Sequence, residues 1–483
     1  MRVNLQAGVY RVDITPPIGI SMCGYLARAG VSNSIQRPLT ATVVVLADGN
    51  KKLVIAGCDL ISIFNPAVDE IRSRIAEAVG TTAECVLINC SHTHCGPNLR
   101  EYSWESEAQR SLQAAYLENL KLALTGCALA ADRQAVPARI GTGQGSSYIG
   151  INRRELDVSG KIFLGEDPNG PMDPTVGVVR IDDINGKPLA VLFSYGCHTV
   201  TMGPKFLGLS PDFPGPARDV IERATGAMAV FLQAAAGDIN PITGIGPTED
   251  DSENMTRLGN SLGGEVLKVL AGIRTNQKRG ERIIFASLTK NSMYPYAPVE
   301  DVSVALDAAG ETVQLPLVDL PSLEDARGIL AQCEQRLAKA KSDGFAPHQL
   351  AFFYRFRDWA QLLLRHAETG DKHLTVGVNL QAMRIGNLAF ASAAGETLVE
   401  LGLGVKAKSP FPETHFFGYS NGCVGYIPPA NCYPAGGWSP WEIYLVPDML
   451  CQSYMLPMHV APEAGQMLVD GCVKLLTQLK VRA

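Results

Sequence analysis

The chain has 483 residues, of which 46% are hydrophobic and 19% are charged, and its formal net charge is −6. This composition is typical of a folded globular protein with a sizeable core, and it excludes disordered and fibrous classes. The acidic balance and the lack of clustered lysine and arginine argue against a nucleic-acid partner. The apolar runs are too short to cross a bilayer, so no transmembrane segment is expected.

The amino terminus passes directly into strand-like alternation, without the apolar centre of a secretory signal. The 12 cysteines form no CxxC pair and stand mostly in apolar contexts. Reduced thiols of this kind are typical of the cytosol. A cytoplasmic location is therefore expected, while the sequence predicts no oligomeric state.

The first predicted elements are strands over residues 8–17, 40–48 and 52–60, the last two joined by a DGN turn. Asp59 ends the third strand and is a candidate for a polar rim that could hold a second metal. Capping of the following helix is the more common role of an aspartate in this position. That helix is predicted over residues 65–79, where Asn65-Pro66 provides a start signal.

The segment VLINCSHTHCGP, residues 86–97, predicts a buried strand that ends in two histidines. Because side chains alternate along a strand, His92 and His94 are expected on one face. Two such imidazoles suit one metal ion, or one ligand together with an acid–base group. A hydrogen-bonded histidine pair in a tight turn is an equally weighted alternative.

A helix is predicted over about residues 105–132, and the glycines of 141–155 predict a loop. This loop has neither a strand-to-helix GxGxxG context nor a GK[ST] motif, which excludes a nucleotide site. Its Arg153 and Arg154 are candidates for binding an anionic substrate group, although surface arginines are more common.

Further strands are predicted to end in groups that can bind a metal. The strand over residues 188–198 ends in His198, and the strand from residue 228 leads to Asp238 and Asn240. A third strand, over residues 387–396, ends at Glu396. If these strands open onto one rim, all of these side chains belong to a single site. The intervening helices are predicted over residues 214–224, 252–272, 322–343, 347–368 and 463–480.

The alternation of strands and helices favours an α/β fold of mixed β-sheets flanked by helices. We expect a single large domain over residues 1–483, with a helical hairpin at about 322–368 as an insertion. The loop-rich segment before the last helix contains Tyr426, Tyr433 and Trp438.

In this order, the motifs resemble the catalytic N-terminal domain of the neutral/alkaline (non-lysosomal) ceramidase family. The resemblance lies in Gly8–Thr15 with Gly24-Tyr25, Ser91–Pro97, Asn152-Arg153, His198, Gly237–Pro241, Ala394–Glu396, and Asn421 with Gly425-Tyr426-Ile427 and Tyr433. The family's C-terminal immunoglobulin-like domain is not expected, because the chain has no room for it.

The resemblance also implies a zinc site with a zinc-activated water as nucleophile. Its implied metal ligands are His92, His198, Glu396 and Tyr426. Asp238 is the expected proton acceptor, and His94, Arg153 or Tyr433 is the expected donor to the developing oxyanion. The expected substrate-binding residues are Asn240, Arg153 and Trp438.

The leading hypothesis is a zinc-dependent hydrolase that cleaves an amide bond of an N-acyl compound. A small polar or sugar-like substrate is at least as well supported as ceramide, because no apolar groove is evident. The alternative is hydrolysis of an ester, lactone or glycosidic-type bond in a small carbohydrate. A second alternative is a catalytically silent binding protein, because Asn240 stands where the family has a serine.

Overall fold

The structure is a computed structural model that describes residues 4–26, 28–299, 303–371, 373–435 and 451–482. Its largest sheet has eight strands in the order β12-β10-β9-β6-β1-β3-β4-β5. In chain order these strands are β1 (Gln6–Asp13), β3 (Thr40–Ala47), β4 (Lys52–Cys58), β5 (Val86–Cys90), β6 (Val136–Ser146), β9 (Thr175–Asp183), β10 (Pro188–Tyr195) and β12 (Met228–Gln233).

The eight-stranded sheet is folded over on itself. Its two halves are joined where β1 pairs briefly with β6, and β12 then lies against β3, β4 and β5. Gly57 in β4 permits this close approach, because a Cβ at that position would stand 2.6 Å from the backbone oxygen of Phe231 in β12. The fold therefore brings the two edges of the sheet together.

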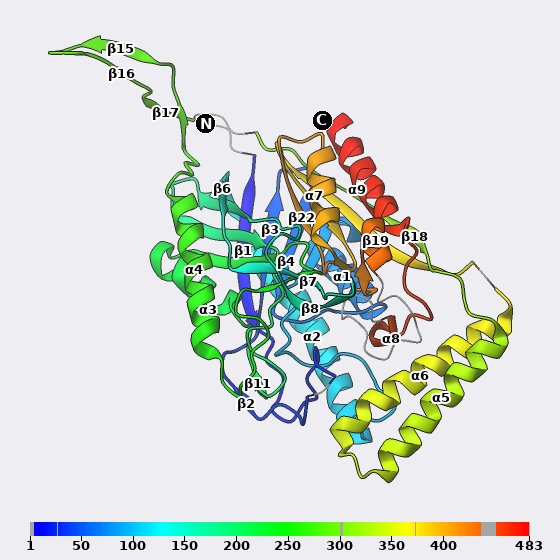
Figure 1. Ribbon diagram of the computed structural model, residues 1–483. Helices are drawn as coiled ribbons and strands as arrows, with labels where there is room; N and C mark the ends of the chain where they lie inside the picture. Colours follow the sequence, from blue (N-terminus) through cyan, green and yellow to red (C-terminus); the bar gives the residue numbers. More distant parts are fainter. Residues whose placement is uncertain (1–3, 27, 300–302, 372, 436–450, 483) are drawn as a thin grey trace.

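Helices cover the outer faces of both halves (Figure 1). The half with β3–β5 packs against α1 (Ala67–Val79) and α2 (Glu107–Arg133). The half with β9, β10 and β12 packs against α3 (Pro214–Thr225) and α4 (Ser252–Leu270). These four helices agree with the sequence prediction to within two residues at each end.

A second sheet, in the order β18-β19-β20-β22, completes the core. Its strands are β18 (Leu306–Pro316), β19 (Thr375–Ile385), β20 (Leu388–Ala393) and β22 (Glu413–Phe417). It packs against α7 (Val399–Lys408) and α9 (Ala464–Val481). Val44, Leu192 and Phe390 belong to one buried cluster, so both halves of the first sheet and the second sheet share a core.

Two excursions leave this body (Figure 1). One is the predicted helical hairpin, confirmed as α5 (Leu323–Ser342) and α6 (Pro347–Thr369). The other is a β-arm, in which β14 (Gln277–Arg279) and β17 (Tyr296–Pro298) form the base and β15 (Ile283–Ala286) and β16 (Lys290–Met293) form the end.

Short elements connect the larger ones. They are β2 (Ser34–Ile35), η1 (Ala83–Cys85, a 3-10 turn), β7 (Gly150–Leu156), β8 (Ile162–Asp167), β11 (Gly208–Leu209), β13 (Ile239–Pro241), β21 (Glu396–Thr397), β23 (Tyr426–Ile427), η2 (Ala430–Ala435, a 3-10 turn) and α8 (Cys451–Tyr454).

The prediction of a glycine-rich loop over residues 141–155 was wrong. Most of this segment belongs to β6 and β7. Gly141, Gly143 and Gly145 alternate along β6, and a Cβ on any of them would stand within 3 Å of side chains of the segment 265–273. The glycines are therefore needed for helix packing on a strand face, and not for turning the chain.

Candidate metal centre and its cavity

Three pairs of parallel strands point their carboxyl ends toward the candidate site. The pairs are β4 with β5, β10 with β12, and β20 with β22. Ligand-binding groups in open α/β sheets gather beyond such strand ends. Here β5 leads to His92 and His94, β10 leads to His198, and β20 leads to Glu396.

The sequence predicts His92 within the strand, but the residue lies in the turn that follows it. β5 ends at Cys90, and His92 has a left-handed backbone with φ of 63°. This conformation is uncommon for a residue with a side chain and is typical of functional sites. His92 and His94 do come together, but through this turn and not through strand alternation.

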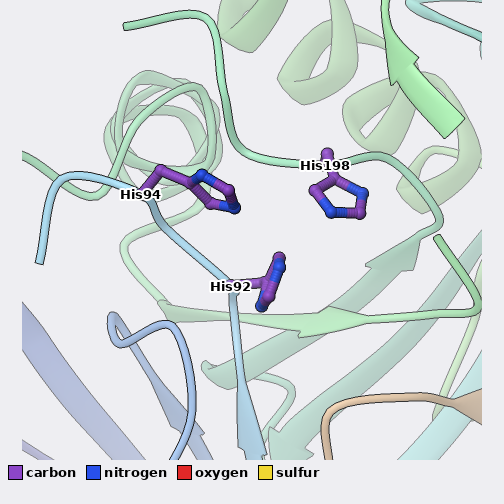
Figure 2. Close-up of side chains that lie close together, drawn as sticks. All are labelled: His92, His94 and His198. Carbon is purple, nitrogen blue, oxygen red and sulfur yellow. The ribbon is translucent and has the colours of Figure 1, made fainter. Parts of the chain in front are cut away.

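The three histidines meet at one point (Figure 2). One ring nitrogen from each of His92, His94 and His198 lies within 4.8 Å of the others, and this cluster can hold a metal ion. The ring of His94 lies directly above Gly24, where a Cβ would stand 2.5 Å from the imidazole. Gly24, whose φ is +94°, therefore makes room for the third histidine.

Backbone carbonyls fix two of the rings. Nδ1 of His92 lies 2.9 Å from the oxygen of Ile61, and Nδ1 of His198 lies 2.6 Å from the oxygen of Ala236. A proton on each Nδ1 leaves the Nε2 lone pair available for a ligand. Both Nε2 atoms lie 3.2 Å from Oε2 of Glu396.

Burial and the charges around it decide the ionisation of the cluster. Burial lowers the pKa of His198 to about 4, and the positive charge of Arg153 acts in the same direction. Burial also holds the pKa of His94 well below its usual value, helped by the neighbouring His92. Near neutral pH these two imidazoles are uncharged, which is the form that binds metals.

Glu396 is fully buried and ionised. Burial alone would raise the pKa of this carboxyl, but the neighbouring imidazoles of His92 and His198 outweigh burial and hold the pKa well below the usual range. Its Oε1 has no hydrogen-bond partner among the described residues, and neither ring nitrogen of His94 has one. Buried polar atoms without partners are rare in proteins, so these groups fit a cation. Neutral imidazoles and a carboxylate are the usual ligands of zinc.

Arg153 links the centre to two other predicted site residues. Its guanidinium donates to Oδ1 of Asn240 at 3.2 Å and to the hydroxyl of Tyr426 at 3.1 Å. Arg153 and Tyr426 line the cavity, whereas Asn240 stands behind the arginine and not among the lining residues. Asn240 is thus placed to orient Arg153. The predicted direct contact between Asn240 and substrate stays a prediction.

Asp238 is buried and is not among the residues that line the cavity. Its carboxylate accepts hydrogen bonds from the side chain of Asn152 at 3.0 Å and from the backbone of Val399 at 2.8 Å. The contact with Val399 satisfies a free amide at the start of α7. Its predicted role as a base stays a prediction.

Two other predicted side chains bind partners outside the histidine cluster. The hydroxyl of Tyr433 donates to the oxygen of Val460 at 2.6 Å, and Tyr433 does not line the cavity. Asp59 forms a buried two-pronged ion pair with Arg218, with distances of 2.8 and 2.7 Å, so it serves the core. Trp438 lies outside the described residues.

A cavity of about 700 Å³ opens above the histidines. Its floor includes His92, His94 and Glu396. Its walls come from the loops after β1 and β5, from α6 and from α8, and its lining is largely aromatic and aliphatic. This volume lies within the usual range for small-molecule sites.

Sequence reasoning missed Tyr419 and two arginines of the wall. The ring of Tyr419 stacks obliquely on His92 with centroids 4.2 Å apart, and its hydroxyl lies 3.4 Å from Oε2 of Glu396. The position of Tyr419, two residues after the end of β22, is the signal that could have found it. Arg100 and Arg355 also line the cavity, but they stand in a loop and a helix without any motif.

No protein-family model matches the chain. It is 26% identical to neutral ceramidase A of Dictyostelium discoideum in an alignment of 271 positions that covers 52% of this chain. Over 268 residues it is 24% identical to the neutral ceramidase of Pseudomonas aeruginosa. The chain is a distant homologue of the neutral ceramidases. The aligned regions span 37% and 40% of these two relatives, well under half of each.

The fold extends this likeness to the whole chain. The crystal structure of the Pseudomonas aeruginosa neutral ceramidase superimposes with a TM-score of 0.68 and 18% identity, covering 100% of this chain and 75% of that one. The mixed α/β architecture is therefore that of the neutral ceramidase catalytic domain. Among the described residues, no helix combines the length and the apolar character that a bilayer crossing requires.

Proposed function

We propose that the protein is a zinc-dependent hydrolase that cleaves the amide bond of an N-acyl small molecule. The observation that carries this proposal is the buried cluster of His92, His94, His198 and Glu396 at the floor of a cavity. Homology to proteins named neutral ceramidases supports the choice of an amide bond.

In this proposal His92, His198 and Glu396 hold the zinc ion. Tyr426 is the fourth ligand that the resemblance implies, and His94 is an alternative fourth ligand because its nitrogens share the cluster. Bound zinc supplies a Lewis acid for the amide carbonyl and lowers the pKa of a water toward about 7. The residues themselves are set for this task, since the carbonyl anchors on His92 and His198 fix both rings before any ligand arrives.

Arg153 is the proposed stabiliser of negative charge on the substrate oxygen. Its guanidinium lies on the cavity wall and is held between Asn240 and Tyr426, so little reorganisation is needed during the reaction. Donors fixed in advance in this way usually contribute a factor of about 10²–10³ to turnover. The family serine is thus replaced by a residue that supports the arginine.

The cavity supports a substrate with an apolar acyl group. Phe352 and Phe353 of α6, with Leu26 and Ile61, give part of the wall an apolar surface. The same wall also carries charged groups, so a purely apolar lipid is not the best match. A small N-acylated molecule with a polar head suits this lining better.

Metal analysis combined with hydrolysis of N-acyl substrates tests the proposal. Protein purified without added metal is expected to contain about one zinc per chain. Removal of the zinc with a chelator is expected to abolish amide hydrolysis, and added zinc to restore it. The proposal would be contradicted if the metal-free protein hydrolysed the amide as fast as the zinc-loaded protein. It would also be contradicted if neither zinc nor another metal restored the lost activity.

A further inference from the structure

Two arginines of the cavity wall converge on one backbone oxygen. Nη1 of Arg100 donates to the carbonyl of Ser453 at 3.2 Å, and Nη1 of Arg355 approaches the same oxygen at 3.4 Å. Arg100 belongs to the loop after β5 and Arg355 to α6, and both line the cavity. We call Arg100 and Arg355 the arginine pair. Two positive charges thus share a single neutral acceptor.

Aromatic rings hold each guanidinium in a fixed plane. Arg100 lies 3.6 Å from the ring centre of Phe64. Arg355 lies 4.3 Å from that of Tyr102 and 5.4 Å from that of Trp104. Stacking of this kind orients a guanidinium and leaves its N–H edge free for planar acceptors. The pair is therefore ordered before any ligand binds.

The arginine pair has no carboxylate partner among the described residues. Of the acids close by in sequence, Glu101 is exposed and forms no ion pair with either arginine, Glu105 accepts from Gln113 at 3.0 Å, and Asp358 accepts from Arg357 at 2.6 Å. Nε of Arg355 is buried without a hydrogen-bond partner, and the residue is only 9% exposed. Burial lowers the pKa of Arg100, and the charge of Arg355 adds to this effect. The pair is thus a cationic site with unused donors.

The described residues that line the cavity carry an excess of positive charge. Arg100 and Arg355 line it, whereas Glu396 is the one carboxylate among its described lining residues and already faces two histidines. Buried charges in proteins are normally paired, so this excess points to a ligand of opposite sign.

We propose that the arginine pair is an anion-recognition site, and that the substrate carries a carboxylate or sulfonate besides the amide bond. The substrate class is then an N-acylated molecule with an apolar acyl chain and an anionic group. Guanidinium groups match such planar or compact oxyanions through paired N–H donors. This inference deepens the proposed function and rests on it for the identity of the scissile bond.

Matched substrates test the inference in the zinc-loaded full chain. N-lauroylglycine and N-lauroyltaurine carry the anion, and N-lauroylethanolamine is their neutral counterpart. We expect kcat/KM to favour at least one anionic compound by about tenfold or more, since charge-assisted hydrogen bonds are stronger than those between neutral groups. Arg355→Met and Arg100→Met keep part of the aromatic packing and should each reduce this preference by about tenfold. Wild-type preference for the neutral compound would overturn the inference.

Arg357→Met is the matched control, because Arg357 lies on the same helix but pairs with Asp358 and does not line the cavity. It should leave the anion preference unchanged, and thermal unfolding verifies that all variants fold. Equal losses of activity toward anionic and neutral compounds in Arg355→Met would also overturn the inference.

Equilibrium binding separates this inference from the proposed function. If no amide is cleaved, the binding of N-lauroylglycine and N-lauroylethanolamine to wild type and Arg355→Met still reports on the anion site. Tighter binding of the glycine compound, lost in the variant, supports the anion site while the hydrolase proposal fails. Equal binding of both compounds by wild type overturns the anion site whatever the fate of the hydrolase proposal.

Discussion

The floor and the wall of the cavity are built in different ways. The floor comes from the ends of buried strands, and backbone carbonyls fix the rings of His92 and His198 there. The wall comes largely from the loop after β5, from α6 and from α8, and its Arg100 and Arg355 are held by stacking and by one shared carbonyl. In the proposed function, the strand ends therefore hold the metal ligands, and the segments of the wall select the substrate.

The largest expected effect concerns the floor. His198→Ala removes a candidate ligand with no exposed surface, so we expect zinc content to fall below about 0.1 per chain and turnover to fall at least about 10³-fold. Elemental analysis and a hydrolysis assay measure both. His366→Ala on α6 is the control and should keep full zinc content, because His366 does not line the cavity. Zinc retention in His198→Ala would show that the cluster is not the metal site.

A variant of Arg153 tests whether this residue acts on the substrate or on the metal. We expect Arg153→Met to lower kcat about 10²-fold while zinc content stays near one per chain, because the arginine is proposed to act on the substrate oxygen and not on the metal. Asn240→Ala removes only one of its supports and should have a smaller effect, about tenfold. Loss of zinc in Arg153→Met would place the arginine in the metal centre instead.

Phe352 tests the wall alone. Its ring lines the cavity and packs on Phe356 with centroids 4.7 Å apart. Phe352→Ala is expected to raise KM about tenfold for a long-chain N-acyl substrate, because apolar contact with the chain is lost. Neither kcat nor zinc content should change. Phe345→Ala, at an exposed position of the same hairpin outside the cavity lining, provides the control. A matching fall in kcat would contradict the prediction that Phe352 contributes to substrate binding alone.

The smallest expected effect is a pH dependence of the metal-free chain. The pKa of His198 is about 4 in the folded state and near 6.5 when unfolded. Between these values the unfolded chain takes up a proton that the folded chain does not. Stability should therefore fall as the pH decreases from about 6.5 toward 4, by at most about 1.4 kcal/mol per pH unit for this residue.

Urea unfolding of wild type and His198→Asn over this range measures the contribution. The difference in unfolding free energy between the two proteins should shrink as the pH decreases, because the variant has no imidazole to protonate there. A constant difference would mean that His198 is not held neutral by the fold.

The sequence predicted the floor better than the wall. His92, His198 and Glu396 follow apolar strands, so strand ends alone placed them on one rim. The left-handed turn at His92 could not be foreseen, because it depends on backbone contacts with Leu60 and Ile61. The glycines of β6 were misread as a loop, since their purpose lies in a helix more than a hundred residues later.

The wall left no comparable pattern in the sequence. Arg100 and Arg355 occur in unrelated segments, and each looks like an ordinary surface arginine. Their function depends on the packing of α6 and α8 over the loop after β5, which no local periodicity encodes. The site role that a family-like motif predicts for Tyr433 stays a prediction, and its hydroxyl donates to the oxygen of Val460.

The separation of Glu396 from His92 along the chain has a consequence for biosynthesis. A ribosome must release nearly four hundred residues before the carboxylate can reach the first imidazole, and the sheet that carries it must then dock. No nascent intermediate shorter than this can contain the complete centre. In the proposed function, binding of a metal to the complete centre therefore follows the synthesis of Glu396.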